Sequence, residues 1–385
     1  MTKRIFEDFD GYEDIVKERE YSRKYGIAYS AGSHAVEPFI NRYHPAKLAL
    51  RVQDIIQETP STKTLRLISD DGYLPPFLAG QYISLPVEVD GIRTSRPYSI
   101  SSPPNQIGYY DITVRRVEGG LVSNYLLDHV SKGDAMITSG PSGHFYYNPL
   151  FHGKEMICIA GGSGITPFMS MICEVVEKGL DRTIFLFYGI RNLDDAIFHD
   201  RLRSLASRFE EFHYIPVIEN PQEGYGGVSG LITADLMREI LGNPDDRTFY
   251  LCGPQGMYDF CISECKKLGV PDRKIRREVY GAPVHIRHDS GWPGDIKAED
   301  LFDVKVMGKG VVKARAGTPL ITTLEKEGIL VPSICRSGEC SMCRVKVVSG
   351  KVFQPAGALV RKSDRKFGYV HACVSYPLED LEIVI

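Results

Sequence analysis

Hydrophobic and polar positions alternate over short stretches in residues 46–150, and turn residues separate the stretches. β-Branched and aromatic side chains are frequent in them, as is typical of half-buried strands. The pattern predicts an antiparallel β-barrel or sandwich. Its expected strands are LALRVQDIIQ from Leu48, then TKTLRLIS, QYISLPVEV, PYSISS and YYDITVRRV.

Residues 151–284 show a different pattern, in which short continuous apolar runs alternate with helical periodicity. EMICIAGG and RTIFLFYGI are typical of strands that are buried on both faces, and a helix is expected to begin at Thr166-Pro167. Strands that alternate with helices predict an α/β domain with a parallel sheet covered on both faces.

The remaining segments predict a linker, a small C-terminal domain and an N-terminal arm. Residues 285–300 are rich in Gly, Pro and charge, as linkers are. Residues 301–385 contain a hairpin pattern, a short helix and further strands. Residues 1–45 form a polar arm with weak helical character. We therefore expect several domains in this chain.

Composition narrows the class of protein. The chain has 385 residues, of which 43% are hydrophobic, and it contains no apolar run long enough to span a membrane. The net charge of -3 gives no general sign of nucleic-acid binding. The charged N-terminal residues do not resemble a signal peptide. We therefore expect a cytoplasmic protein whose nine cysteines serve as thiols, metal ligands or catalytic groups.

The charge is unevenly distributed. Residues 302–385 carry 13 Lys and Arg against 8 Asp and Glu, a net charge of +5, and the rest of the chain carries -8. A basic terminal domain suggests docking to a partner with an acidic face. Scattered solvated lysines are the alternative interpretation.

Four cysteines, Cys335, Cys340, Cys343 and Cys373, follow the spacing C-x4-C-x2-C and then, after 29 residues, C. This is the plant-type ferredoxin pattern for a [2Fe-2S] cluster, which needs four convergent thiolates. Small residues in the loop allow backbone amides to turn towards the sulfurs. Structural zinc more often uses two close pairs of ligands, and here the fourth cysteine stands alone.

Two further motifs lie in the predicted barrel. Arg96, Tyr98 and Ser99 lie close together on one strand, where the guanidinium can pair with a phosphate. Gly119, Gly120 and Ser123 precede an apolar helix, whose N-terminus can accept a phosphate or pyrophosphate. An ordinary strand with a surface arginine, and a helix capped by Ser123, are the alternatives.

Two glycine-containing turns follow buried strands in the predicted parallel sheet. AGGSGITP contains Gly162, Gly164 and Thr166, and CGPQG begins with Cys252, Gly253 and Pro254. Turns at the carboxyl ends of parallel strands can face one ligand crevice. A tight turn without a ligand, and a buried thiol at Cys252, are the alternatives.

Five motifs in this order, RPYS, GGLVS, AGGSGITP, CGPQG and the four cysteines, resemble the ferredoxin–NADP reductase superfamily. The resemblance is to the form with a C-terminal plant-type ferredoxin domain, which includes reductase components of multicomponent oxygenases, and it covers residues 47–385. It implies a β-barrel flavin domain, an α/β NAD(P) domain and a β-grasp [2Fe-2S] domain. It also implies electron transfer from NAD(P)H through a flavin and the cluster to an external metalloprotein.

The resemblance implies a role for each matching residue. Arg96 would bind a flavin phosphate, Tyr98 would pack on the flavin ring, and Ser99 would bond near its N5 atom. Gly119, Gly120 and Ser123 would lie at the pyrophosphate. Gly162, Gly164, Thr166, Gly253 and Pro254 would hold the nicotinamide dinucleotide. Cys252 would lie beside the nicotinamide, and REVYG would supply Glu278 and Tyr280 near the reacting rings.

Three choices stay open at this level. Arg191 could pair with the 2′-phosphate of NADPH, whereas Asp194 and Asp195 favour NADH. The turn at Gly119 favours FAD over FMN. The acceptor is expected to be an oxygenase component, with a corrinoid protein as the alternative. The alternative from a different class of function is a non-enzymatic scaffold with a zinc or empty C-terminal site.

Overall fold

The computed structural model describes residues 12–25, 36–244, 246–283 and 285–385. The chain divides into two compact units, Met1–Ala46 and Lys47–Ile385. The described part of the first unit consists of helices α1 (Tyr12–Tyr25) and α3 (Val36–Tyr43). The predicted helical character of the arm is therefore confirmed over α1.

Antiparallel strands form the first part of the larger unit. Four of them pair in the order β5-β2-β1-β6, and β3 pairs with β4. Single bridges, Tyr82 to Ser142 and Ile100 to Ile112, connect the two groups. The elements are β1 (Leu48–Thr59), β2 (Thr62–Ile68), β3 (Tyr82–Val89), β4 (Ile92–Ser99), β5 (Tyr110–Arg115), α4 (Leu121–Asp128) and β6 (Ala135–Thr138).

The core of this β-domain follows the alternation seen in the sequence. In β1, Leu48, Leu50 and Val52 are buried, whereas Ala49 between them is exposed. Inward side chains of β2 and β5 join the same core, and so do Val122 and Leu126 of α4. The helix is thereby held against the barrel with its N-terminus beside β5.

A six-stranded parallel sheet follows, in the order β10-β9-β8-β7-β11-β12. The chain leaves β7 towards β8 and returns to pair on its other side as β11, so the topology switches between β7 and β11. Its elements are β7 (Glu155–Gly161), η1 (Gly162–Ile165), α5 (Thr166–Lys178), β8 (Thr183–Ile190), η2 (Leu193–Asp195), α6 (His199–Ala206), β9 (Phe212–Ile218), β10 (Val228–Ser229), α7 (Ala234–Leu241), β11 (Thr248–Cys252), α8 (Gln255–Lys267), η3 (Asp272–Lys274) and β12 (Ile275–Glu278).

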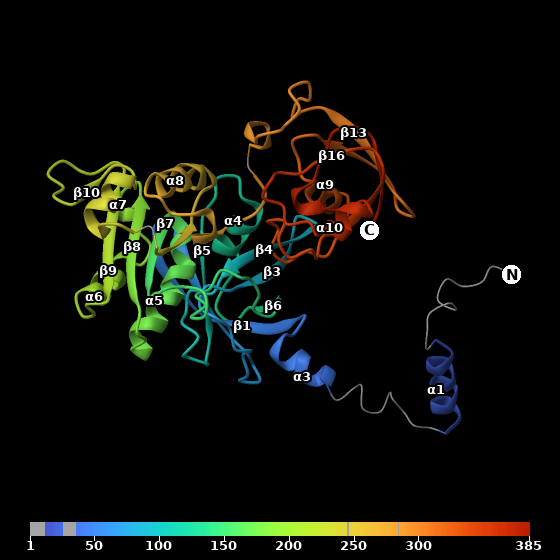
Figure 1. The fold of residues 1–385 in the computed structure, drawn as a ribbon, viewed down its shortest axis with the longest axis horizontal. Helices are drawn as coiled ribbons and strands as arrows, with labels where there is room; N and C mark the ends of the chain where they lie inside the picture. The colour runs from blue at the N-terminus through green and yellow to red at the C-terminus, as the bar shows by residue number, and fades with distance from the viewer. Residues whose placement is uncertain (1–11, 26–35, 245, 284) are drawn as a thin grey trace. The chain divides into compact units, whose positions relative to one another are not determined.

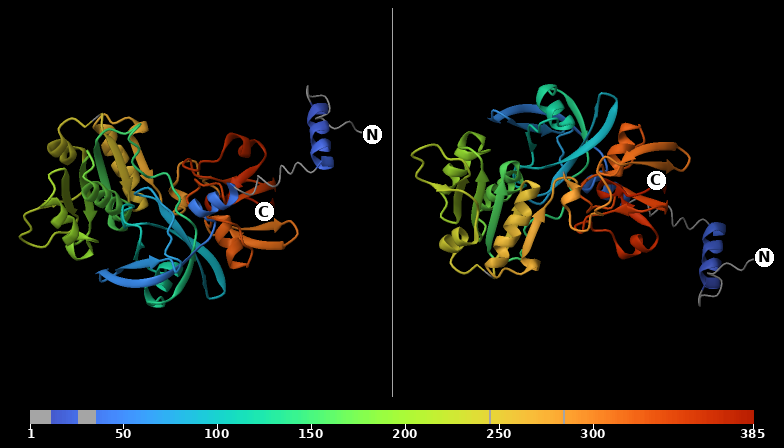
Figure 2. Two further views of the ribbon diagram at one scale, coloured as in Figure 1. Left: turned by 90° about the horizontal axis from the view of Figure 1, so that it is seen from below. Right: turned by 90° about the horizontal axis from the view of Figure 1, so that it is seen from above.

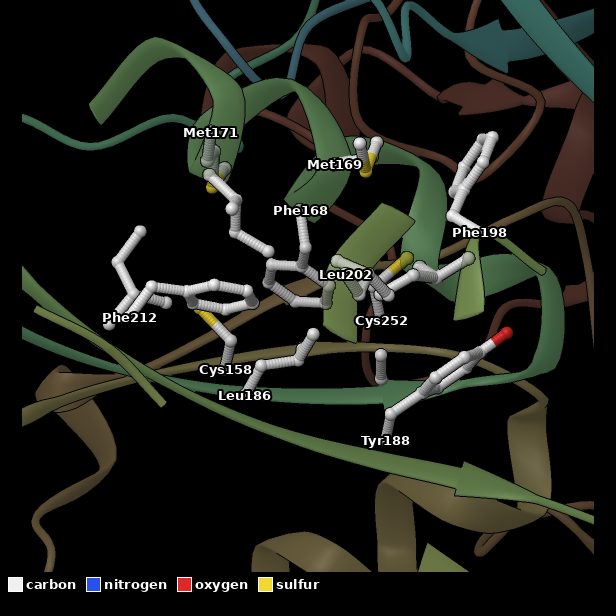
Figure 3. Close-up of a cluster of buried hydrophobic side chains, with 14 of the residues drawn as sticks. Cys158, Phe168, Met169, Met171, Leu186, Tyr188, Phe198, Leu202, Phe212 and Cys252 are labelled. Carbon is white, nitrogen blue, oxygen red and sulfur yellow. The ribbon is translucent and has the colours of Figure 1, made fainter. Parts of the chain in front are cut away.

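Helices cover both faces of the parallel sheet (Figure 1). Cys158 of β7 packs in the core under α5 and α6, which Figure 3 shows with Phe168 and Leu202. The neighbouring Ile157 and Ile159 point to the opposite core, under α7 and α8. Alternate burial on two faces explains why these strands read as continuous apolar runs. The predicted α/β domain is confirmed.

The C-terminal domain, orange to red in Figure 2, contains a five-stranded mixed sheet in the order β14-β13-β19-β15-β17. Helix α9 packs against this sheet. The predicted hairpin is β13 and β14, and β19 joins β13 in parallel. Its elements are η4 (Ile286–His288), β13 (Leu301–Val306), β14 (Gly310–Arg315), α9 (Leu320–Lys326), β15 (Arg344–Ser349), β16 (Val352–Phe353), α10 (Lys362–Lys366), β17 (Tyr369–His371), η5 (Ala372–Val374), β18 (Tyr376–Pro377) and β19 (Leu381–Val384).

One local expectation was wrong. Ser123, considered as a helix cap, lies inside α4, and the N-cap is Gly120, which has no side chain to cap the helix. The first amides of α4 are therefore without a side-chain partner. In the part of the chain that the structure describes, no helix is long and apolar enough to cross a membrane.

Candidate active site

A cavity of about 540 Å³ lies where the three domains of the larger unit meet. Such a volume is typical of sites for cofactor-sized ligands. The barrel contributes Arg96, Pro97, Tyr98, Ser99, Thr113, Arg115, Val117, Gly120, Leu121, Val122 and Ser123. The α/β domain with its following turn contributes Ser163, Thr166, Tyr280, Gly281 and Ala282. The C-terminal domain contributes Pro319, Ile321, Thr322, Arg336 and Cys373.

One side of the cavity is suited to a phosphate. Arg96 donates to the Thr94 hydroxyl at 2.8 Å and to the Ser95 carbonyl at 2.7 Å. Burial lowers the pKa of its guanidinium, and nearby Arg336 lowers it further. The uncapped N-terminus of α4 lies on the same cavity, at Gly120. A Cβ atom at Gly120 would lie 2.4 Å from Ser123 Oγ, so this turn accepts only glycine without rearrangement. A mostly buried cation and free amides together favour an anionic ligand.

Hydroxyl groups from two domains meet on another wall. Ser99 Oγ and Tyr280 Oη are 2.9 Å apart, and Thr166 Oγ1 is 3.4 Å from the same Tyr280 oxygen. The Cys252 thiol, which is fully buried, also interacts with the Tyr280 hydroxyl. Burial raises the pKa of that thiol well above its ordinary value, so Cys252 is a neutral thiol. Tyr280 thus connects the ends of β4 and β11.

The two glycine-containing turns lie side by side at the switch point of the sheet. Cys252 of β11 is paired with Ala160 of β7, and Gly164 lies directly against the end of β11. A Cβ atom at Gly164 would be 2.0 Å from the Cys252 carbonyl oxygen, and one at Gly253 would be 3.1 Å from the Gly161 Cα atom. This close approach requires glycine and holds both turns against each other at the carboxyl ends of β7 and β11, where parallel sheets commonly bind ligands.

Arg115 reaches from the barrel to the first of these turns. The Arg115 guanidinium lies 3.7 Å from the Asp195 carboxylate. A Cβ atom at Gly162 would lie 2.6 Å from Nη1 of Arg115. Asp195 is therefore already engaged by an arginine. Arg191 is exposed and follows the same strand, β8.

Glu278 ends β12 beside the C-terminal domain. Its carboxyl is buried, and burial raises its pKa well above the ordinary value, with a further contribution from Glu339. Burial likewise raises the pKa of Glu339 to about 6. Both carboxyl groups lie close enough to Cys335 for its charge to affect them, so Glu278 faces the cysteine loop.

The four cysteines converge around the loop of residues 335–343. The Cys335 thiol interacts with those of Cys340 and Cys373, and Cys373 also interacts with Cys343. The amides of Ser337 and Cys340 each donate to Cys335 Sγ at 3.4 Å.

Inward amides and several thiols spread over one loop fit a [2Fe-2S] cluster. The described residues contain no group of three or more His, Cys, Asp or Glu placed to hold a single metal ion.

The cluster loop is held by its surroundings. His371 is fully buried and donates from Nδ1 to the Gly338 carbonyl at 2.8 Å. Gly338 has a φ of 84°, and a Cβ atom there would be 2.7 Å from Val374. The other five cysteines, Cys158, Cys173, Cys252, Cys261 and Cys265, are buried in the two cores of the α/β domain.

The structure brings together on the cavity eight of the residues singled out in the sequence: Arg96, Tyr98, Ser99, Gly120, Ser123, Thr166, Tyr280 and Cys373. The others do not line it: Gly119, Gly162, Gly164, Arg191, Cys252, Gly253, Pro254, Glu278, Cys335, Cys340 and Cys343. Sequence reasoning missed Arg115 and Arg336. A large cation among the small residues of the cysteine loop was the available signal for Arg336.

Matches to known families agree with this three-part site. Residues 49–147 match the oxidoreductase FAD-binding domain, residues 158–262 the oxidoreductase NAD-binding domain, and residues 304–378 the 2Fe-2S iron-sulfur cluster binding domain. The chain belongs to the ferredoxin–NADP reductase superfamily, in the form with a C-terminal [2Fe-2S] domain. It is an NAD(P)H-dependent oxidoreductase with FAD-binding and cluster-binding domains.

Relatives extend over nearly the whole chain. NADH oxidoreductase HCR of Escherichia coli (strain K12) is 32% identical over 335 residues, which cover 86% of this chain and 96% of that protein. The glycine betaine monooxygenase reductase subunit of Pseudomonas aeruginosa (strain UCBPP-PA14) is 28% identical over 346 residues, which cover 87% of this chain and 94% of that protein. The solved structure of phthalate dioxygenase reductase matches with a TM-score of 0.64 at 25% identity, over 88% of this chain and 98% of that one.

Proposed function

We propose that this reductase takes electrons from NADH, passes them through FAD to the [2Fe-2S] cluster, and delivers them to the metal centre of an oxygenase component. The observation that supports it most directly is the position of Cys373. This predicted cluster ligand lines the same cavity as the predicted flavin residues Arg96 and Tyr98. A flavin in that cavity would therefore lie against the cluster.

The bound flavin would supply the conversion from two-electron to one-electron transfer. The chain's own residues would bind and orient it. Arg96 and the N-terminus of α4 would hold its phosphate, and Tyr98 would pack on its ring. Ser99, Tyr280 and Thr166 offer a fixed set of hydroxyl groups at the reacting edge. Cys252, as a neutral thiol, would fill space beside the nicotinamide without introducing charge.

The preference for NADH rests on the adenosine end of the crevice. Asp194 and Asp195 follow β8, where a ribose would lie, and a carboxylate there disfavours a 2′-phosphate. Arg115 pairs with Asp195, so its guanidinium is partly neutralised. The Escherichia coli relative is itself named an NADH oxidoreductase. The exposed Arg191, which follows β8, is the cation that could meet a 2′-phosphate there, since Arg115 is already paired with Asp195.

An oxygenase component as acceptor is supported by the names of the relatives, several of which are reductase subunits of monooxygenases. The test is the anaerobic reduction of a purified Rieske or diiron oxygenase component by NADH and catalytic amounts of this protein. Reduction within seconds would support the proposal. If this protein reduces a corrinoid protein but no oxygenase component, the acceptor is a corrinoid protein and our proposal is wrong.

We also propose where the acceptor docks. Arg361, Lys362, Arg365 and Lys366 are all exposed, and no ion pair is found for them among the described residues. This basic face adjoins the cluster loop, because the neighbouring Leu359 amide donates to the Gly338 carbonyl at 3.0 Å. Exposed Leu359 and Phe367 flank the four cations. Such a face suits an acidic partner. The free thiols that a cluster needs support our proposal of a cytoplasmic protein, because the cytoplasm is reducing.

Charge reversal tests this docking face. Lys362→Glu with Lys366→Glu should slow the reduction of acidic cytochrome b5 at least tenfold at low salt, and much less at high salt. NADH–ferricyanide activity should not change. Lys309→Glu is the matched control, since Lys309 is exposed in the β13–β14 turn, at the opposite edge of the sheet. Equal effects of both changes would contradict the assignment.

A further inference from the structure

Arg96 of the barrel and Arg336 of the C-terminal domain both line the cavity, and one carboxylate, Glu325, pairs with Arg336 and is connected to Arg96 through Thr94. Arg336 donates to Glu325 through Nη1 at 2.7 Å and through Nη2 at 2.8 Å, and all these groups are buried. Arg96 donates only to the neutral Thr94 hydroxyl and Ser95 carbonyl. No ion pair of Arg96 is found in the described ranges of the chain. This wall therefore has an excess positive charge that is largely removed from water, which an anionic ligand would offset.

The two arginines are connected through the domain interface. Thr94 Oγ1 accepts from Arg96 at 2.8 Å and donates to Glu325 Oε2 at 2.9 Å. Glu325 belongs to α9 of the C-terminal domain, and Thr94 belongs to β4 of the barrel. An unbroken chain of hydrogen bonds thus runs from Arg96 through Thr94 and Glu325 to Arg336.

The backbone at Arg336 is unusual for an arginine. Its φ is 56°, in the left-handed region that favours glycine. Despite this, the position carries a long side chain, which lines the cavity as well as bonding to Glu325. A guanidinium has five N–H donors, and the bonds to Glu325 and a weaker one to Ser333 at 3.4 Å use three of them. Donors therefore remain for a ligand.

We propose that Arg336 of the cluster loop is a second cation at the flavin phosphate, so that binding of the flavin and docking of the ferredoxin domain on the barrel stabilise each other. The inference rests on the proposed flavin site and goes beyond it, because Arg96 is the one cation that the resemblance assigns to the phosphate. Thr94 and Glu325 are positioning residues that hold the two guanidinium groups together.

The first test compares three flavins. Wild-type protein, Arg336→Gln and Arg336→Lys are each titrated with FAD, FMN and riboflavin, and the dissociation constants are measured by flavin fluorescence. Arg336→Gln should weaken FAD and FMN binding about tenfold or more, the effect of losing a hydrogen bond between charged groups. Riboflavin, which has no phosphate, should bind as before. Arg336→Lys should recover part of the loss, because it restores the charge but not the fork of donors.

The outcomes separate this inference from the proposed function. Unchanged binding of FAD and FMN by Arg336→Gln, or an equal loss for riboflavin, would overturn the role of Arg336. A wild-type protein that binds none of the three flavins would instead overturn the flavin site itself. Iron content and the visible cluster spectrum are measured in every variant, so that collapse of the cluster loop is recognised.

A second variant leaves the cluster loop intact. Thr94→Val removes the hydroxyl between Arg96 and Glu325 and should weaken FMN binding several-fold. Ser95→Ala is the matched control, because it removes a different contact across the interface, to Ser333 at 3.1 Å, and keeps the backbone carbonyl that accepts from Arg96.

Hydrogen exchange of residues 333–337 is then measured with and without FMN. Flavin should slow this exchange in wild type and Ser95→Ala but not in Thr94→Val. Equal slowing in all three would contradict the coupling between the domains.

Discussion

At the scale of single residues, Cys373 links two sites. It completes the set of four cysteines and also lines the cavity that we assign to the flavin. The cysteine spacing was readable from the sequence because [2Fe-2S] ligation imposes it locally. The contact with the cavity was not, because it depends on how the C-terminal domain packs on the barrel. Glu325 and Thr94, which are 231 residues apart, illustrate the same limit.

Loss of one ligand should separate the two redox sites. Cys340→Ser should abolish NADH-dependent reduction of cytochrome c, since the cluster would be lost, and should leave NADH–ferricyanide activity within about twofold, because that acceptor takes electrons from the flavin. Both rates are measured, and the iron content of each variant is determined alongside them. Cys261→Ala, at a buried thiol in α8, is the control and should keep both activities. Survival of both activities in Cys340→Ser would refute the cluster assignment.

Cys252 offers a second residue-scale test. Cys252→Ala should slow reduction of the flavin by NADH roughly tenfold or more, because the thiol that fixes Tyr280 and the nicotinamide position is lost. Flavin content should not change, since Cys252 does not line the flavin cavity. Stopped-flow bleaching of the flavin band measures the rate. A variant that loses its flavin would show instead that Cys252 is structural.

At the scale of elements, the turns after β7 and β11 lie against each other where we propose that the nucleotide binds. The long strands and helices were predictable because their apolar periodicity extends over many residues. The two-residue strands β10, β16 and β18 and the four-residue β6 carry too little pattern to predict. The cap of α4 was mistaken because Ser123 is a good capping residue type, yet the turn at Gly120 begins the helix three residues earlier.

The contact between the two turns makes a prediction about stability. Gly164→Ala should destabilise the protein by about 1–3 kcal/mol, because its Cβ atom would overlap the Cys252 carbonyl oxygen. It should also weaken NADH binding. Denaturant unfolding and NADH titration measure the two effects. Gly256→Ala in α8, where a Cβ atom meets nothing within 4 Å, is the control and should not destabilise. If Gly164→Ala changed neither the stability to denaturant nor NADH binding, the close packing of Gly164 against Cys252 would be contradicted.

At the scale of the whole molecule, the Lys47–Ile385 unit places three domains around one cavity. Each wall of the cavity comes from a different domain. The sequence motifs could therefore predict the residues of each wall, but not that the three domains pack around one cavity. The meeting of the domains at this cavity, and not their order along the chain, would set the proposed electron path from the nicotinamide through the flavin to the cluster. The basic face beside the cluster loop would then be the exit of that path.

The three-part electron path is tested by the visible spectrum of anaerobically purified protein, recorded before and after one equivalent of NADH and, separately, of NADPH. We predict flavin bands over a broad cluster absorption, and bleaching of both by NADH at a far higher rate than by NADPH. If NADPH bleached these bands and NADH did not, the electron donor would be NADPH. A protein that stays colourless after reconstitution with iron, sulfide and flavin would contradict the three-part electron path.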